Sequence, residues 1–409
     1  MKSRIVLIIF MLMIGTVSIT VAYNFNKIDS SLNSHGKLNL DDRFVLITNT
    51  GADQVMLVDT SGSIIWQTIG LAEPVDAELL ANGNVLIVEM DGDRVIEVDI
   101  TGSIIWENTS FDAPMDIERL SNGNTLITEC TESGSGRIVE LDIYGTIVWQ
   151  KSASGYPFDA ERISNGNTLI VQCQSNQVIE VDPSGSTVWS KTGLHMPCDA
   201  ERLSNGNTLI ADYMNYRVIE VNSGGSIVWS ITNLAGPPLD AERLSNSNTL
   251  IALATGVVIE VNSGGTTVWQ KTGLSGPYDA EEFLNNPPED PSIDGTVNGE
   301  VGVEYDYTIV TDDPDDNNVF YWVDWGDNSN SGWVGPYFPN EEVVLSHSWS
   351  IRGDYTIEVI SKDIFGSESD WTTLDVTMPL NQPVSQESPL FGWFLNHFPM
   401  IGSLLEFSV

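Results

Sequence analysis

The chain has 409 residues, enough for about two or three domains, and carries 57 Asp and Glu against 17 Lys and Arg, a formal net charge of −40. This acidic balance argues against nucleic acid or anionic lipid as a partner, because phosphate binding needs a cationic surface. It leaves two interpretations open: attraction of cations or basic partners, or a surface charge that only keeps the protein in solution.

Residues 1–22 predict an export signal. Lys2 and Arg4 precede the apolar run "IVLIIFMLMIGTVSI", and the small residues "TVA" follow it. The run is shorter than the roughly 20 residues of a membrane-spanning helix, which favours cleavage after Ala22 over an uncleaved anchor. We therefore expect a secreted, cell-surface-associated protein, with residues 23–43 as a spacer and no membrane span in the mature chain.

A motif of the form "DAERLSNGNTLI" recurs six times, with its Asp at positions 76, 116, 159, 199, 240 and 279. Each unit of about 40 residues contains four short alternating segments rich in β-branched residues. "SNGN" supplies the positive φ angles of a tight hairpin, and we expect a looser turn where Ser247 replaces the glycine. The pattern predicts an all-β chain with a six-bladed β-propeller at 44–284.

The first and last copies of the repeat are incomplete in complementary ways. "RFVLITNT" at 43–50 matches a second strand with no first strand before it. "DAEEFLNN" at 279–286 matches a first strand with nothing after it. We predict that these segments pair, so that strand exchange between the two ends closes the ring and leaves no open edge.

The repeat also resembles known propellers. "DAERLSNGNTLIADYMNYRVIEVNSGGSIVW" is similar to NHL-type repeats, and its "NGNTLI" portion resembles the arylsulfotransferase-like propellers of the quinoprotein-like group. The resemblance implies the fold, because such propellers serve enzymes, sensors and adhesive proteins alike. Arylsulfotransferase-like enzymes use a catalytic histidine, and the propeller segment contains only His195, which no motif places.

In an NHL-like arrangement the first strand of each blade is the innermost, and residues i and i+2 share a face. The acids predicted to surround the channel are Asp76, Glu78, Asp116, Glu118, Asp159, Glu161, Asp199, Glu201, Asp240, Glu242, Asp279 and Glu281. Two interpretations follow. Either the acids accept backbone N–H bonds, with the Arg after Glu pairing to a Glu of the adjacent blade, or the ring binds Ca²⁺ or another hard cation.

The fourth entry loop, "GLHMPCDAE", is the one that differs from the others. It holds His195 and Cys198, and Cys130 and Cys173 end second strands expected to reach the same face. A His/Cys set of this kind suits zinc or copper. The alternatives are a Cys173–Cys198 disulfide in an exported protein, or three free buried thiols.

Because repeat proteins vary their loops on one face, we expect the entry loops to form the ligand rim. These loops are residues 71–75, 111–115, 154–158, 194–198, 234–239 and 274–278. His195 is the candidate for any catalytic role in this rim, and the competing interpretation is an exposed loop residue.

Residues 285–295 are rich in Pro and Asp and predict a linker. After it, "YWVDWGDNS" and "HSWSIRGDYTIEVISKDIFG" resemble a PKD domain, which implies an Ig-like β-sandwich at 296–379. Asn328 stands where that motif usually has Gly. The loop "TDDPDDNN" offers Asp313 and Asp315, among others, as Ca²⁺ ligands; it lacks the EF-hand glycine, so we expect a solvated turn.

Residues 380–409 form an apolar, aromatic tail interrupted by Asn396, His397 and Pro399. This makes a poor membrane span and predicts a segment that associates with a membrane or surface. Taken together, the sequence favours an exported binding protein whose partner is a surface protein or glycan, with Ca²⁺ as an optional cofactor. The alternative is a propeller enzyme of the arylsulfotransferase-like or lyase kind, acting at the His195 face.

Overall fold

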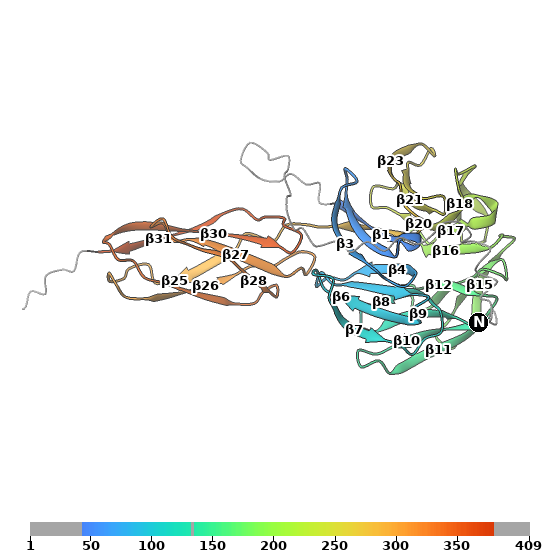
Figure 1. The fold of residues 1–409 in the computed structure, drawn as a ribbon, viewed down its shortest axis with the longest axis horizontal. Helices are drawn as coiled ribbons and strands as arrows, with labels where there is room; N and C mark the ends of the chain where they lie inside the picture. Colours follow the sequence, from blue (N-terminus) through green and yellow to red (C-terminus); the bar gives the residue numbers. More distant parts are fainter. Residues whose placement is uncertain (1–42, 132–134, 380–409) are drawn as a thin grey trace, which may run out of the picture. The chain divides into compact units, whose positions relative to one another are not determined.

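The computed structural model describes residues 43–131 and 135–379. The chain divides into two compact units, Met1–Asn286 and Pro287–Val409 (Figure 1). The predicted signal at 1–22, all of the spacer except Arg43, and the tail at 380–409 lie outside the described residues. Within the described ranges, no helix is both long and apolar enough to cross a membrane.

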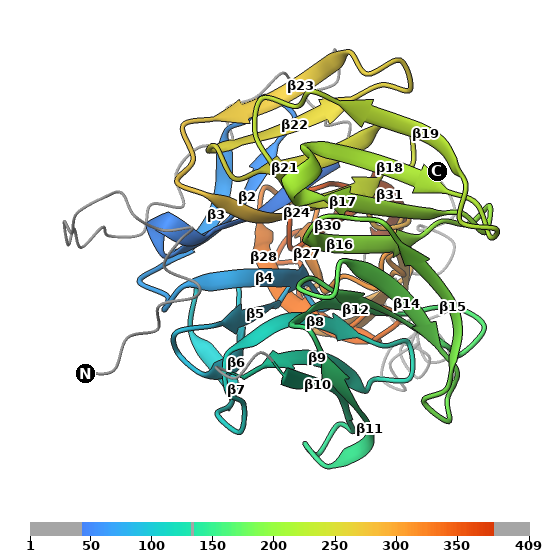
Figure 2. The same cartoon turned by 90° about the vertical axis from the view of Figure 1, so that its right-hand side faces the viewer.

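The first unit is all-β and consists of repeated four-stranded antiparallel sheets around a common centre, a propeller architecture (Figure 2). Five sheets follow the chain order, with the first strand innermost. They are β4 (Pro74–Leu79), β5 (Val85–Glu89), β6 (Arg94–Val98), β7 (Ile104–Asn108); β8 (Pro114–Arg119), β9 (Thr125–Cys130), β10 (Ser135–Leu141), β11 (Ile147–Ser154); β12 (Pro157–Arg162), β13 (Thr168–Gln172), β14 (Gln177–Val181), β15 (Thr187–Thr192); β16 (Pro197–Arg202), β17 (Thr208–Asp212), β18 (Arg217–Val221), β19 (Ile227–Thr232); and β20 (Pro238–Arg243), β21 (Thr249–Leu253), β22 (Val257–Val261), β23 (Thr267–Thr272).

The sixth sheet joins the two ends of this unit. Its order is β24 (Pro277–Leu284), β1 (Arg43–Asn49), β2 (Gln54–Asp59) and β3 (Ile64–Ile69). β24 pairs antiparallel with β1 in a register that sets Phe283 opposite Phe44. The predicted strand exchange is confirmed. Arg43 Nη1 also contacts Glu260 Oε2 at 2.8 Å, which ties β1 to the neighbouring sheet.

The second strand of each sheet is buried along its length, as in β17 and β21, except for Arg43 at the start of β1. Continuous apolar runs suit these strands because both faces of each sheet pack against neighbouring sheets. At the outer strands, the repeated Trp joins adjacent sheets. Its indole Nε1 donates to a turn carbonyl of the next sheet, at 2.9 Å from Trp66 to Ile100 and from Trp269 to Thr60. The repeated tryptophans therefore pack sheet against sheet.

The "SNGN" turns keep one geometry even where glycine is absent. Gly206 has φ 82°, and its N–H donates to the Leu203 carbonyl at 2.8 Å. Ser247 has φ 69° and makes the same 2.8 Å bond to Leu244. The looser turn expected at Ser247 is therefore wrong, because the two flanking strands impose the left-handed conformation on a residue that disfavours it.

The second unit contains two antiparallel sheets around one core. One is β25 (Ser292–Gly295), β26 (Tyr305–Val310) and β29 (Val343–His347); the other is β28 (Asn330–Tyr337), β27 (Val319–Asp324), β30 (Gly353–Asp363) and β31 (Thr372–Met378). Tyr307, Tyr321 and Trp349 are fully buried between them. The predicted linker at 285–295 needs a correction: its last residues are β25, because the short stretch "SIDG" pairs with β26 despite the preceding prolines.

Candidate functional site

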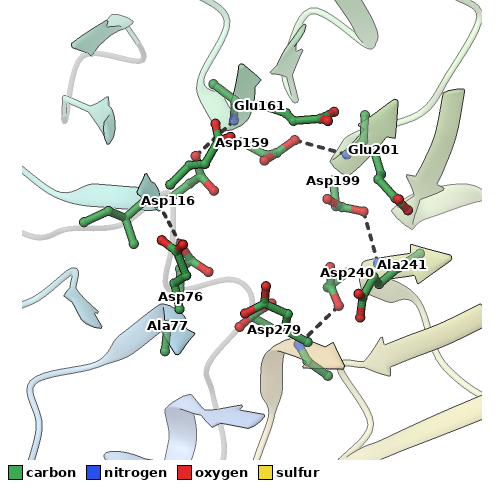
Figure 3. A pocket seen from close by; sticks show the side chains of 18 residues that line it. Asp76, Ala77, Asp116, Asp159, Glu161, Asp199, Glu201, Asp240, Ala241 and Asp279 are labelled. Atoms are coloured by element: carbon green, nitrogen blue, oxygen red, sulfur yellow. Dashed lines mark hydrogen bonds between the residues drawn. The ribbon is translucent and has the colours of Figure 1, made fainter. Parts of the chain in front are cut away.

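The innermost strands of the six sheets enclose a cavity of about 290 Å³. All twelve carboxylates named from the sequence line it, together with the residue between each Asp and Glu (Figure 3). The side chains come from β4, β8, β12, β16, β20 and β24, which follow one another around the channel. The channel is therefore a polar cavity with acidic walls.

The Asp side chains join each innermost strand to the next one. An innermost strand has a free edge toward the channel, and its N–H groups need acceptors. Asp76 Oδ2 accepts from the Ile117 N–H at 2.6 Å, and Asp199 Oδ2 accepts from the Ala241 N–H at 3.1 Å (Figure 3). The same bond recurs for Asp116, Asp159 and Asp240, to Ala160, Ala200 and Ala280.

The Glu side chains repeat this arrangement two residues further along. Glu78 Oε2 accepts from the Arg119 N–H at 2.6 Å. Glu118, Glu161, Glu201 and Glu242 do the same with the corresponding residues, Arg162, Arg202, Arg243 and Glu282. Glu281 differs: among the described residues its carboxylate accepts no backbone N–H. The predicted use of the acids as inter-blade acceptors is confirmed for these Asp and Glu side chains.

The Arg that follows the Glu of the repeated motif pairs with another Glu, which lies in the third strand of the preceding sheet. Arg202 Nη2 lies 2.9 Å from Glu180 Oε2, and Arg243 Nη2 lies 3.0 Å from Glu220 Oε2. The "SNGN" turn holds the same Glu, since Asn207 Nδ2 donates to Glu220 Oε1 at 2.6 Å. Nearly every conspicuous residue of the motif thus makes a contact within or between sheets.

Burial raises the pKa of the channel carboxyls. It raises the pKa of Asp76 and of Glu161 to about 7, and that of Glu78 to about 8, against the lowering effect of their backbone bonds. Burial first, and then the neighbouring acids, raises the pKa of Glu281 well above its usual range. Crowded carboxylates of one sign cannot all ionise, so the channel retains protons near neutral pH.

A feature that sequence reasoning missed lies one residue before each Asp. The strand register shifts at this position in every sheet, so a β-bulge precedes each acid. The bulge residues are Val75, Met115, Phe158, Cys198, Leu239 and Tyr278. The apolar residue between Pro and Asp in each copy was the available signal.

Two of these bulge residues meet across the channel. Phe158 and Tyr278 stack with ring centroids 5.7 Å apart and an interplanar angle of 20°. They belong to β12 and β24, which stand opposite one another in the ring of six sheets. Both rings are half-buried. The aromatic pair thus spans the channel axis directly beside the Asp ring, on the side of the entry loops.

His195 lies on that same side and is exposed. Its backbone N–H donates to Asp212 Oδ1 at 2.7 Å, and its carbonyl accepts from the Met214 N–H at 3.0 Å. The imidazole ring makes no hydrogen bond to any described residue. Met214, in the 3₁₀ turn Tyr213–Asn215, and Tyr216 beside it are 37 % and 47 % exposed.

The three cysteines are buried free thiols. Burial raises the pKa of the Cys130 and Cys198 thiols, and a hydrogen bond with Cys173 adds to the effect at Cys198. Across residues 43–131 and 135–379, no group of three or more His, Cys, Asp or Glu is arranged to hold a metal ion.

In the second unit, the loop at 311–318 departs from the expected solvated turn. Asp313 is only 2 % exposed, whereas Asp315 is half-buried and Asp316 is exposed. The two pairs of acids on either side of Pro314 gave no sign that one of them points inward. Asp313 turns in because its Oδ1 accepts two backbone N–H bonds of its own loop.

Several solved structures resemble parts of this chain. A protein of unknown function from Bacteroides caccae is 17% identical, with a TM-score of 0.52, over 59% of this chain and 99% of its own. The PKD domain of an M14-like peptidase from a Thermoplasmatales archaeon is 46% identical over 24% of this chain and 99% of its own, with a TM-score of 0.23. A streptogramin B lyase is 16% identical over 56% of this chain and 79% of its own, with a TM-score of 0.44.

No curated protein matches the chain. The first of these likenesses concerns the fold alone and says nothing about activity. The family model described as outer membrane protein assembly factor BamB matches residues 28–155 and 134–303, which together exceed half of the chain. The chain therefore belongs to the family of the outer membrane protein assembly factor BamB.

Proposed function

We propose that this chain is an exported, cell-surface binding protein, built from a closed six-bladed propeller and an Ig-like sandwich of the PKD kind. The export signal predicted at 1–22 and the net charge of −40 support a surface location. The six four-stranded sheets and the two-sheet second unit support the two domain types.

We assign binding to the entry-loop side of the propeller, around the aromatic pair. Phe158 and Tyr278 form a half-buried apolar floor at the centre of this side, and Met214, Tyr216 and His195 belong to the loops around it. Aromatic residues and Met are enriched at protein interfaces, and aromatic anchors carry much of the binding energy. The proposal rests on the half-buried aromatic pair and on the exposed Met214 and Tyr216, whose loop is hydrogen-bonded to the entry loop of His195.

The partner that fits best is a protein with a basic, partly apolar surface. The family is described as an assembly factor, which is a binding role. The strongly acidic surface favours association with positive partners. A surface glycan, whose sugar rings also present an apolar face, is the other outcome that the binding test distinguishes.

A binding role is preferred over an enzyme of the arylsulfotransferase-like or lyase kind. General acid–base catalysis needs a second group that orients or activates the histidine. The His195 ring has no hydrogen-bond partner among the described residues. Ca²⁺ binding in the channel and surface association of the tail stay predictions.

The test is capture of surface proteins and of an oligosaccharide array by the purified protein, followed by affinity measurement. The double variant Met214→Ala/Tyr216→Ala should weaken binding at least about tenfold, as loss of interface anchors does. Val228→Ala, which truncates an exposed residue on the outer strand of the same sheet, is the matched control. Equal affinity of both variants and the wild type would refute the assignment of this side.

A further inference from the structure

The end of the second unit where β30 finishes contains buried oxygen atoms that protein donors do not satisfy. The loop between β26 and β27 and the end of β30 meet here, because the β27–β30 register sets Val319 opposite Asp363. Asp313 and Asp363 are 2 % and 1 % exposed. Two buried carboxyls thus lie at one edge of the two-sheet core.

Asp313 has one oxygen in use and one without a partner. Its Oδ1 accepts the N–H of Asp315 at 2.9 Å and that of Asn317 at 3.1 Å. Its Oδ2 is buried and accepts no hydrogen bond, and Asp313 forms no ion pair with any described residue. A buried charged oxygen without compensation costs several kcal/mol, so such an atom calls for a partner.

The carboxylate of Asp363 is held in place by hydrogen bonds from the backbone of the turn that follows it. Its Oδ1 accepts the N–H groups of Phe365, Gly366 and Ser367, at 2.8, 2.7 and 3.0 Å. The Asp313 carboxyl meets a like charge here: burial first, and then Asp363 and Asp315, raise the pKa of Asp313 to about 6.

A second buried oxygen also lacks a hydrogen-bond donor. Asn318 Oδ1 is shielded from solvent and has no hydrogen-bond partner. A proton on Asp313 would remove the charge repulsion, but it would leave the amide oxygen of Asn318 unsatisfied. Carboxylate and amide oxygens are the ligands that hard cations such as Ca²⁺ prefer.

We propose that the second unit binds a Ca²⁺ ion between the β26–β27 loop and the end of β30, with Asp313 Oδ2 and Asn318 Oδ1 as ligands and Asp363 supplying a second negative charge. Ca²⁺ accepts six to eight oxygen ligands in flexible geometry, so main-chain oxygens and water complete the shell. Mg²⁺ demands a near-ideal octahedron and dehydrates reluctantly, which suits irregular loop ligands less well.

The ion would also fix the segment that enters this unit. The Glu289 N–H donates to the Asp312 carbonyl at 2.9 Å, and the Asp370 N–H donates to Asp290 Oδ1 at 2.8 Å. These bonds attach residues 289–290 to both loops of the proposed site. Calcium should therefore protect the entering segment as well as the loops.

The proposal is tested on the full chain, stripped with EDTA and titrated with CaCl₂ by calorimetry, with MgCl₂ and NaCl as ionic controls. Amide hydrogen exchange, measured in parallel, locates the effect. We expect saturable Ca²⁺ binding with slower exchange at 311–318, 363–369 and 287–291. Slower exchange confined to the propeller strands, or no heat beyond the ionic controls, would overturn the proposal.

Variants separate this site from acidic charge in general. Asp313→Asn keeps the acceptor for the two loop N–H groups but loses the charge, and should weaken Ca²⁺ affinity at least about tenfold, since affinity follows ligand charge. Asn318→Ala should also weaken it. Asp316→Asn removes the same charge from an exposed position of the same loop and should bind as the wild type does. Asp313→Asn binding Ca²⁺ like the wild type would contradict the assignment.

Discussion

Asp76 Oδ2 accepts a 2.6 Å hydrogen bond from the backbone N–H of Ile117, the residue after the equivalent Asp of the next sheet. This contact explains why one acidic motif is repeated around the ring. Each innermost strand presents N–H groups to the channel, and the preceding sheet supplies the carboxylates that satisfy them. The acids therefore link neighbouring sheets by hydrogen bonds. Their hydrogen bonds and their protonation govern how the ring responds to mutation and pH.

Removing one of these hydrogen bonds between sheets should destabilise the propeller. Asp76→Ala leaves the Ile117 N–H without its acceptor, which should cost about 1–3 kcal/mol. Asp76→Asn keeps an oxygen acceptor and should cost less. Denaturant unfolding of the two variants and the wild type gives the free energies directly. A cost for Asp76→Asn equal to that for Asp76→Ala would show that the accepted hydrogen bond is not what matters.

Stability should fall as pH rises through neutrality. The pKa values of Asp76, Glu78 and Glu242 are raised to about 7, 8 and 8 by burial, above their values in the unfolded chain. The folded state then holds more protons than the unfolded state, so their stabilisation is complete below about pH 4 and is lost as pH rises through 7–8. Melting temperatures of the propeller at pH 5 and pH 8 check this.

Glu281 provides the control for the pH effect, because it lacks the backbone bond that the other Glu residues accept and is surrounded by acids. Glu281→Gln should raise the melting temperature at pH 8 and reduce the loss between pH 5 and pH 8. A propeller that melts higher at pH 8 than at pH 5 would contradict this account of the channel.

Closure of the ring depends on β24. Deleting residues 277–284 removes the strand that pairs with β1 and exposes the inner edge of the sixth sheet. The loss should be several kcal/mol, on the order of that for one buried strand. Calorimetry should show a lower propeller transition with the second unit's transition unchanged. An unchanged propeller transition would mean that the exchange contributes nothing to stability.

Ser247 stores backbone strain that glycine would relieve. It has φ 69° in a turn where the equivalent residue is Gly206. Ser247→Gly should stabilise the propeller by roughly 1 kcal/mol, and Gly206→Ser should destabilise it by a similar amount. Equilibrium unfolding of this reciprocal pair is the measurement. Destabilisation by both substitutions would indicate that the Ser247 side chain makes a compensating contact.

Most of the propeller fold could be predicted from the repeat. Alternation, the Asn-Gly turns and the incomplete first and last copies predicted the strands and the pairing of 279–284 with 44–50, because these signals are local or repeat at a fixed period. The role of the repeated Asp and Glu as hydrogen-bond acceptors was also predictable, since residues i and i+2 of an edge strand share a face.

The parts that were missed depend on packing between segments far apart in sequence. The Phe158–Tyr278 stack joins opposite sheets, and no local period relates the two positions. Asp313 and Asp363 are both buried and interact electrostatically, although they lie 50 residues apart in the sequence. In both cases the residue type was visible, but its neighbours were set by tertiary structure.

The measurement that tests the binding account most directly is amide hydrogen exchange of the full chain with and without the partner captured by the wild type. We expect slower exchange in the entry loops and in the turn at 213–216, on the side of the Phe158–Tyr278 pair. Protection confined to the "SNGN" turns on the opposite side, or to the second unit, would contradict it.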